Sequence, residues 1–170
     1  MATVSLSLDE IYKLANKTLL ANGCDQETAD ILSELITNAE RDGSLSHGLF
    51  RLPAYVSGLK SGKINGKQKP DIKKLTPSVI KADGKNCLAP VVLNKSIPEL
   101  VKAAKENGVA VLAIINSHHM AAMWPETEKI ADEGLVAFAC TSYKPAVAPA
   151  GAIKPLFGTN PISFAWPRKN

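Results

Sequence analysis

Apolar residues recur at helical spacing through the first sixty positions of the chain. Ser7 and Glu10 form a capping box ahead of the first apolar stripe, which fixes where that helix begins. Pro53 fits only the first turn of the last helix in this region. Three helices are predicted: one between Ser7 and Gly23, one over 25–42 that ends at Gly43, and one over 49–61.

Beyond a segment rich in glycine, lysine and proline (62–70), strand patterns alternate with helical ones. The predicted strands are 72–76, 78–81, 109–115, 135–140 and 162–165, and the predicted helices are 89–107 and 125–133. The runs 109–115 and 135–140 are apolar enough to predict buried strands. Ser96 and Glu99 flank Pro98 as a second capping box and predict a break or kink there. Strands separated by helices favour an α/β fold.

Composition narrows the class of protein. Seven lysines lie between residues 60 and 81, but neither aromatic residues nor arginines stand among them. This pattern favours a solvated connector over a phosphate-binding or nucleic-acid surface. The three cysteines are an odd number at wide spacing, so the sequence predicts neither a disulfide framework nor a zinc site. Without a signal-peptide pattern or a membrane-length apolar run, the sequence predicts a soluble cytoplasmic protein.

The segment 116–122 directly follows the run 109–115, where functional groups of open α/β sheets gather. It contains His118 and His119, followed by small residues. Adjacent histidines on an extended segment point to opposite sides, so a shared metal ion is disfavoured and no metal is expected. The alternative is a buried, hydrogen-bonded histidine.

Ser46, His47 and Gly48 follow the second predicted helix, and Arg51 stands four residues after His47. At this spacing an imidazole and a guanidinium can face one ligand. The guanidinium would bind a carboxylate through two hydrogen bonds, and the imidazole would transfer a proton. The alternative is that Ser46 caps the third helix while Arg51 pairs with a nearby acid. A turn at 158–161 contains Thr159, whose hydroxyl and neighbouring N–H groups could meet a phosphate.

These segments together resemble the malate/L-lactate dehydrogenase family of NAD(P)-dependent oxidoreductases, which is distinct from the Rossmann-type lactate and malate dehydrogenases. The pattern S-H-G-x-x-R-x-P-x-Y is matched by Ser46, His47, Gly48, Arg51, Pro53 and Tyr55. The pattern N-S-x-H-[FM]-[GA] is matched by residues 116–121, and a proline-rich stretch by 145–151 and 155–161. The variant S-H-H-M-A-A-M-W-P looks most like the branch of cyclic imino acid reductases.

The resemblance implies a role for each matched residue. His47 would donate the proton to the substrate, Ser46 would position it, and Arg51 would hold the substrate carboxylate. His119 would lie beside the nicotinamide and substrate as an acid or base. The cofactor would be contacted by His118, His119, Met120, Ala121, Ala122 and Thr159.

The same resemblance implies NADPH as cofactor (alternatively NADH) and a homodimer. The substrate would be a small cyclic imino acid, piperideine-2-carboxylate or pyrroline-2-carboxylate, reduced to the L-amino acid. The implied fold is a helical N-terminal domain (1–70), contributing to the substrate and dimer region, then part of a non-Rossmann NAD(P)-binding mixed α/β domain (71–170).

Two departures from the family pattern keep other functions open. Ser142, Tyr143 and Lys144 stand where many members carry Asn and Ser. The resemblance covers only the N-terminal half of the family pattern, without the acidic partner of the catalytic histidine. A malate- or lactate-type dehydrogenase of 2-oxo or 2-hydroxy acids is one alternative. A truncated, non-catalytic fragment of such an enzyme is another.

Overall fold

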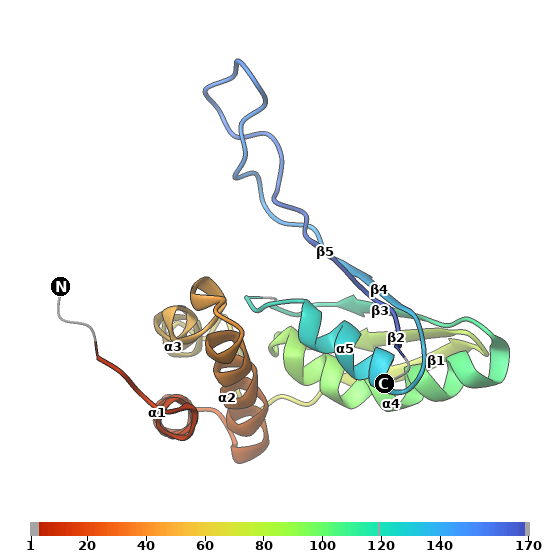
Figure 1. Ribbon diagram of the computed structural model, residues 1–170, viewed down its shortest axis with the longest axis horizontal. Helices are drawn as coiled ribbons and strands as arrows, with labels where there is room; N and C mark the ends of the chain where they lie inside the picture. Colours follow the sequence, from red (N-terminus) through yellow and green to blue (C-terminus); the bar gives the residue numbers. More distant parts are fainter. Residues whose placement is uncertain (1–3, 119, 169–170) are drawn as a thin grey trace. The chain divides into compact units, whose positions relative to one another are not determined.

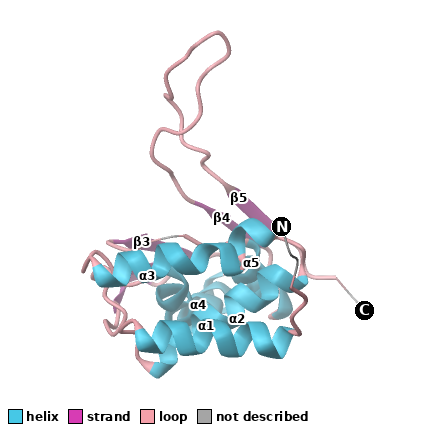
Figure 2. Ribbon diagram, turned by 90° about the vertical axis from the view of Figure 1, so that its left-hand side faces the viewer, coloured by secondary structure: helices cyan, strands magenta, loops and turns pink. Residues whose placement is uncertain are grey.

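The structure is a computed structural model that describes residues 4–118 and 120–168. The chain divides into two compact units, residues 1–122 and 123–170. In Figure 1 it can be followed from α1 in red to β5 in blue, and Figure 2 distinguishes helices, strands and loops. The α/β class expected from the sequence is confirmed.

The first unit begins with three helices: α1 (Leu8–Ala21), α2 (Gln26–Arg41) and α3 (Leu52–Lys60). Local hydrogen bonds determine where α1 and α2 begin. The Ser7 side chain accepts from the Glu10 N–H, and the Ser7 N–H donates to the Glu10 carboxylate, so the predicted capping box is confirmed. Asp25 caps α2 by accepting from the Thr28 N–H at 2.9 Å.

The rest of this unit is a three-stranded sheet with one long helix. The strands β1 (Asp71–Thr76), β2 (Val79–Asp83) and β3 (Val111–Ile115) lie in the order β1-β2-β3, with α4 (Ala89–Asn107) joining β2 to β3. β1 and β2 pair antiparallel, whereas β2 and β3 pair parallel, from Val79 opposite Val111 to Asp83 opposite Ile115. Parallel strands need such a crossover connection.

One core joins the helices to the sheet and α4. It contains Leu19, Leu32, Ile36 and Tyr55 from the helices, and Ala82, Leu88, Val91 and Val92 from the second part. The core therefore continues across residue 70, where the sequence predicted a domain boundary. That boundary stays a prediction about the domain organisation.

Of the break or kink expected at Pro98, the break is wrong, because α4 is continuous from Ala89 to Asn107. Apolar side chains are buried on both sides of the proline, including Val91, Val92, Val101 and Ala103. Burial of one long face outweighs the roughly 3 kcal/mol cost of a helical proline. Ser96 is fully buried within the helix and is not a cap, and Glu99 instead lies 3.6 Å from the Lys74 ammonium.

The second unit contains α5 (Trp124–Asp132), β4 (Ala137–Cys140) and β5 (Ile162–Ala165). The two strands pair antiparallel, and Figure 2 draws the long segment between them as loop. Gly134, at φ +79°, follows α5 as the sequence predicts.

The expectation that 109–115 and 135–140 are fully buried is wrong. Val111 is 55% exposed and Phe138 is 64% exposed, and exposure alternates along both β3 and β4. A continuous apolar run is typical of a strand covered on both faces. Within the described residues, each of these strands has cover on one face only.

Candidate functional site

The Ser46–His47–Arg51 cluster lies on two short 3-10 turns, Leu45–His47 and Leu49–Arg51, between α2 and α3. The His47 N–H donates to the Ser44 carbonyl at 2.8 Å, which holds the first turn. Its Nδ1 lies 3.0 Å from the Ser46 hydroxyl and 3.4 Å from the Ser44 hydroxyl. The two hydroxyls therefore orient the imidazole. Ser46 does not cap α3, whose N-cap residue is Arg51.

The surroundings of His47 favour its neutral form. Partial burial lowers the pKa of the imidazole below its usual 6.5, and the nearby positive charge of Arg51 lowers it further. The two residues lie on consecutive 3-10 turns separated by Gly48. A negative charge bound beside Arg51 would offset the guanidinium and raise the pKa of His47 again.

One hydrogen-bond donor of Arg51 is unsatisfied within the described residues. Its side chain is half-buried, and its Nε is buried without a hydrogen-bond partner among the described residues. An unsatisfied buried donor costs roughly 1–3 kcal/mol, so the group gains from any acceptor brought to it. Nε and a terminal nitrogen of a guanidinium together match the two oxygens of a carboxylate. The arrangement suits an acidic ligand.

Glu40 holds the backbone of this cluster through a hydrogen bond, and the sequence analysis missed it. Its carboxylate accepts from the Leu49 N–H at 2.7 Å. A Cβ added at Gly48 would lie 2.1 Å from the same carboxylate oxygen, so only glycine leaves room for it. The sequence signal was available, because an acid in the last turn of a helix can reach the turn that follows.

The segment after β3 is fixed by its backbone. Asn116 adopts φ +50°, and its carbonyl accepts from the Asn86 N–H at 2.8 Å. The His118 N–H donates to Cys87 O and the Ala89 N–H donates to His118 O, both at 3.0 Å. The segment carrying His118 is thus held against the turn that begins α4.

Tyr55 links this segment to the helix that follows Arg51. Its ring is fully buried, and its hydroxyl donates to the Met120 carbonyl at 3.1 Å. Because Tyr55 lies one helical turn after Arg51, the bond brings the loop after β3 to the helix beside the His47–Arg51 cluster. The two segments singled out in the sequence therefore share one scaffold in the first unit.

The remaining expected site residues differ in their accessibility. His118 and Met120 are half-buried, whereas Ala121 and Ala122 are buried. His119 lies outside the described residues. Thr159 belongs to the second unit and is exposed. The turn at 158–161 that contains Thr159 is joined to Tyr143, whose N–H donates to the Asn160 side chain at 3.0 Å.

Glu126 is a second residue that the sequence analysis missed. It lies in the first turn of α5 and is buried, and burial raises the pKa of its carboxyl to about 7. An acid that titrates near neutrality is a common feature of functional sites. The sequence offered only a weak signal, a glutamate just after Pro125 at a helix start.

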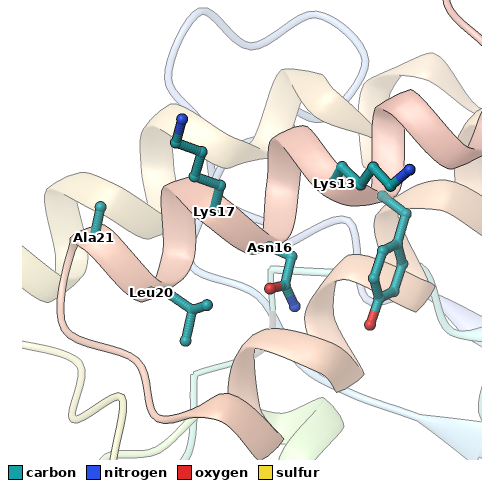
Figure 3. Close-up of a pocket in the computed structure, with 6 residues that line it drawn as sticks. Lys13, Asn16, Lys17, Leu20 and Ala21 are labelled. Carbon is teal, nitrogen blue, oxygen red and sulfur yellow. The ribbon is translucent and has the colours of Figure 1, made fainter.

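The other features of the described residues offer no competing site. No three His, Cys, Asp or Glu side chains there lie together as metal ligands would, and no helix there is long and apolar enough to cross a membrane. Figure 3 shows a hollow lined only by α1 residues, among them Lys13, Lys17 and Leu20. One helix borders it, so it encloses a ligand poorly.

Residues 6–170 match the family described as malate/L-lactate dehydrogenase, and the chain belongs to that family. It is 41% identical over 168 residues to the Delta(1)-pyrroline-2-carboxylate reductase 1 of Burkholderia ambifaria, covering 99% of this chain and 49% of that protein. The chain spans about half the length of the curated relatives it matches.

Solved structures agree with this placement. The crystal structure of delta1-piperideine-2-carboxylate reductase from Pseudomonas syringae superimposes with a TM-score of 0.91 at 41% identity, over 98% of this chain and 50% of that one. Malate dehydrogenase from Pyrococcus horikoshii gives the same TM-score at 32% identity, over 98% and 48%. The predicted family resemblance is confirmed.

Proposed function

We propose that this chain carries the substrate-binding part of an NAD(P)H-dependent reductase of small cyclic 2-imino acids, piperideine-2-carboxylate or pyrroline-2-carboxylate. The observation that carries the proposal is the His47–Arg51 pair, with its buried, unsatisfied Nε. This pair occurs on a chain 41% identical to reductases of that name over nearly its whole length.

Arg51 binds the substrate carboxylate through Nε and one terminal nitrogen. The bound carboxylate offsets the guanidinium charge, so the pKa of His47 rises and its imidazole can hold a proton beside the substrate. Ser46 keeps the ring turned toward that position through its contact with Nδ1. The protein therefore supplies orientation, a positive anchor and a proton.

The nicotinamide cofactor, NADPH or alternatively NADH, supplies a hydride when bound. We assign its contacts to His118, His119, Met120, Ala121, Ala122 and Thr159. The anchored backbone around His118 suits this role because it holds its shape before a ligand arrives. Ala121 and Ala122 are buried, so they would act through their backbone and their small size. His119 would lie at the nicotinamide.

A malate- or lactate-type dehydrogenase is the second candidate, favoured by the match to the Pyrococcus malate dehydrogenase. Such substrates also carry a carboxylate beside the reacting carbon, so the same Arg51 would serve them. A homodimer remains part of the proposal for the complete enzyme.

The lysine-rich connector does not favour a nucleic-acid function. Lys69 lies 2.8 Å from the Asp25 carboxylate and is also paired with Glu27, and Lys73 and Lys74 lie near Asp71 and Glu99. Acids of the same chain thus pair with three of the seven lysines, whose charge is then less available to a phosphate backbone.

The decisive experiment joins residues 1–170 to the part of the Pseudomonas syringae reductase that the chain does not match. The chimera should oxidise NADPH with piperideine-2-carboxylate, and Arg51→Lys should raise KM at least about tenfold, because lysine lacks the two-pronged geometry. Lys60→Arg, on the exposed end of α3, is the control. A folded chimera that reduces only 2-oxo acids would favour the second candidate.

A further inference from the structure

The dipeptide Asn-Gly occurs three times in the chain, at 22–23, 65–66 and 107–108. Asparagine is a thermolabile residue, because the backbone nitrogen that follows it can attack its side-chain carboxamide. A glycine in the next position favours this attack, since it has no Cβ to crowd the approach. Each dipeptide therefore reacts only as far as the fold leaves the glycine N–H and the carboxamide free.

The first dipeptide is held at the end of a helix. Asn22 is the C-cap residue of α1, and its side-chain nitrogen donates to the Thr18 carbonyl at 2.8 Å. The Gly23 N–H donates to the Leu20 carbonyl at 3.3 Å. Both the attacking nitrogen and the carboxamide are thus engaged in hydrogen bonds to the helix.

The third dipeptide is held in the same way. Asn107 is the last residue of α4, and its side-chain nitrogen donates to the Ala103 carbonyl at 2.8 Å and to the Pro77 carbonyl at 3.1 Å. The Gly108 N–H donates to the Ala104 carbonyl at 2.9 Å. At either helix end, reaction requires these bonds to open first.

The second dipeptide lies in the lysine-rich connector and is held differently. Asn65 is exposed, and its side-chain oxygen accepts from the Lys67 N–H at 3.1 Å. This Asx turn folds the carboxamide back over the peptide that follows, and a hydrogen bond to the oxygen makes the carboxamide carbon more electrophilic. Within the described residues, no hydrogen bond uses the Gly66 N–H or the Asn65 side-chain nitrogen.

We propose that Asn65 is a site of spontaneous deamidation, which the fold selects over the other two Asn-Gly dipeptides. The Gly66 nitrogen loses its proton to hydroxide and attacks Cγ of Asn65. The new N–Cγ bond forms, the Cγ–Nδ2 bond breaks, and the nitrogen leaves as ammonia with a proton from water. Water then opens the succinimide ring at either carbonyl, which gives aspartate or isoaspartate at position 65.

The neighbouring backbone gives this modification a structural consequence. The Asn65 N–H donates to the Asn86 carbonyl at 3.0 Å, and the Gly66 carbonyl accepts from the Asp25 N–H at 3.1 Å. Isoaspartate adds one carbon to the backbone between these two bonds, so they no longer fit together. The Asn86 N–H in turn donates to the Asn116 carbonyl, so the affected turn adjoins the loop after β3.

The test follows the three dipeptides while the folded chain is incubated at mildly alkaline pH. Trypsin cleaves after lysine and arginine, so it releases Asn65 in the peptide 64–67 and the other two dipeptides in 18–41 and 106–129. A mass gain of about 1 Da marks the product, and fragmentation assigns it to one asparagine. Asn65 should gain this mass at least about tenfold faster than the other two, because they react only after local opening.

Urea is the matched control, because it unfolds all three environments. In urea the three dipeptides should react at similar rates, since the hydrogen bonds at the helix ends are gone. Asn65→Gln is the control variant. It should abolish the mass gain in 64–67 and leave the other two peptides unchanged, because the longer side chain closes the corresponding ring far more slowly.

A second measurement separates the backbone change from the change in charge. The isoaspartate form, purified by chromatography, should melt about 2–4 °C lower than the unaltered chain, and its Asp25 amide should exchange faster. Asn65→Asp has the same charge on an ordinary backbone, so it should change neither property. An isoaspartate form with unaltered melting temperature and exchange would contradict the structural consequence.

The other outcomes overturn the proposal itself. Equal rates in the folded chain, or faster reaction at 22–23 or 107–108, would show that the helix ends do not protect their dipeptides. A preference for Asn65 that is unchanged in urea would assign it to the sequence and not to the fold. Reaction of Asn65 in urea but not in the folded chain would show that the buried Gly66 is held too firmly to attack. None of these readouts uses enzymatic activity, so the proposed reaction is tested separately.

Discussion

The Tyr55 hydroxyl donates a hydrogen bond to the Met120 carbonyl, 3.1 Å away and 65 residues later in the chain. This bond joins α3 to the segment that follows β3. It ties together the two parts of the chain that carry the candidate catalytic and cofactor-binding residues. Because Tyr55 is fully buried, the hydroxyl has little access to water as a substitute partner.

Tyr55→Phe should lower the free energy of unfolding by about 1–2 kcal/mol, since the ring stays packed while the Met120 carbonyl loses its donor. Urea unfolding measures the change, and faster hydrogen exchange over 116–122 locates it. Tyr143→Phe, at an exposed tyrosine in the second unit, is the matched control. Unchanged exchange in Tyr55→Phe would show that the bond does not hold the loop.

The His47 imidazole should titrate below pH 6.5 in an NMR experiment on the folded chain, because burial and Arg51 both favour its neutral form. Arg51→Gln removes the smaller of these causes, so the midpoint should rise but remain below 6.5. Adding pyrrole-2-carboxylate, a planar carboxylate probe, should raise the titration midpoint of His47 in the unaltered chain. It should not change that midpoint in Arg51→Gln.

The same shift has a consequence for stability. Between the folded midpoint of His47 and pH 6.5 the unfolded chain binds more protons than the folded one. The contribution of His47 is therefore fully present above pH 6.5 and is lost as the pH falls to the folded midpoint. His47→Gln should remove this part of the pH dependence of unfolding.

Gly48→Ala should destabilise the chain by about 1–3 kcal/mol, because its methyl group would displace the Glu40 carboxylate from the Leu49 N–H. A double-mutant cycle tests the cause. In a Glu40→Ala background the space is already open, so the second substitution should cost much less. Additive costs for the two changes would contradict this account.

Glu126 should make the stability fall as the pH rises from 4.5 to about 7. In that range the folded chain keeps the proton on the buried carboxyl, whereas the unfolded chain has lost it. A pKa rise from 4.5 to about 7, at about 1.4 kcal/mol per pH unit, corresponds to about 3 kcal/mol. Glu126→Gln, which stays neutral, should match the unaltered chain near pH 4 and exceed it at pH 8.

Glu128→Gln is the control for this measurement, because Glu128 lies on the same helix and is exposed. Its stability profile should follow that of the unaltered chain. If Glu126→Gln has the same free energy of unfolding as the unaltered chain at both pH values, the Glu126 carboxyl is charged in the folded chain and its raised pKa is wrong.

The sequence by itself determined the features that depend on neighbouring residues. Ser7 with Glu10, Asp25, Gly108 and Gly134 set the ends of helices because each acts through hydrogen bonds or backbone angles within a few residues. The family also followed from local motifs. The pairing of His47 with Arg51 stays a prediction, because the two residues lie on two separate 3-10 turns and not on one helical turn.

Only the tertiary structure decided what distant parts of the chain do to one another. Pro98 stays helical because its whole helix buries one face, and β3 and β4 are half-exposed because each has cover on one side only. The Tyr55–Met120 bond joins residues that no local pattern relates. Burial and long-range hydrogen bonding depend on which surfaces meet, and a linear pattern of apolar residues does not specify that.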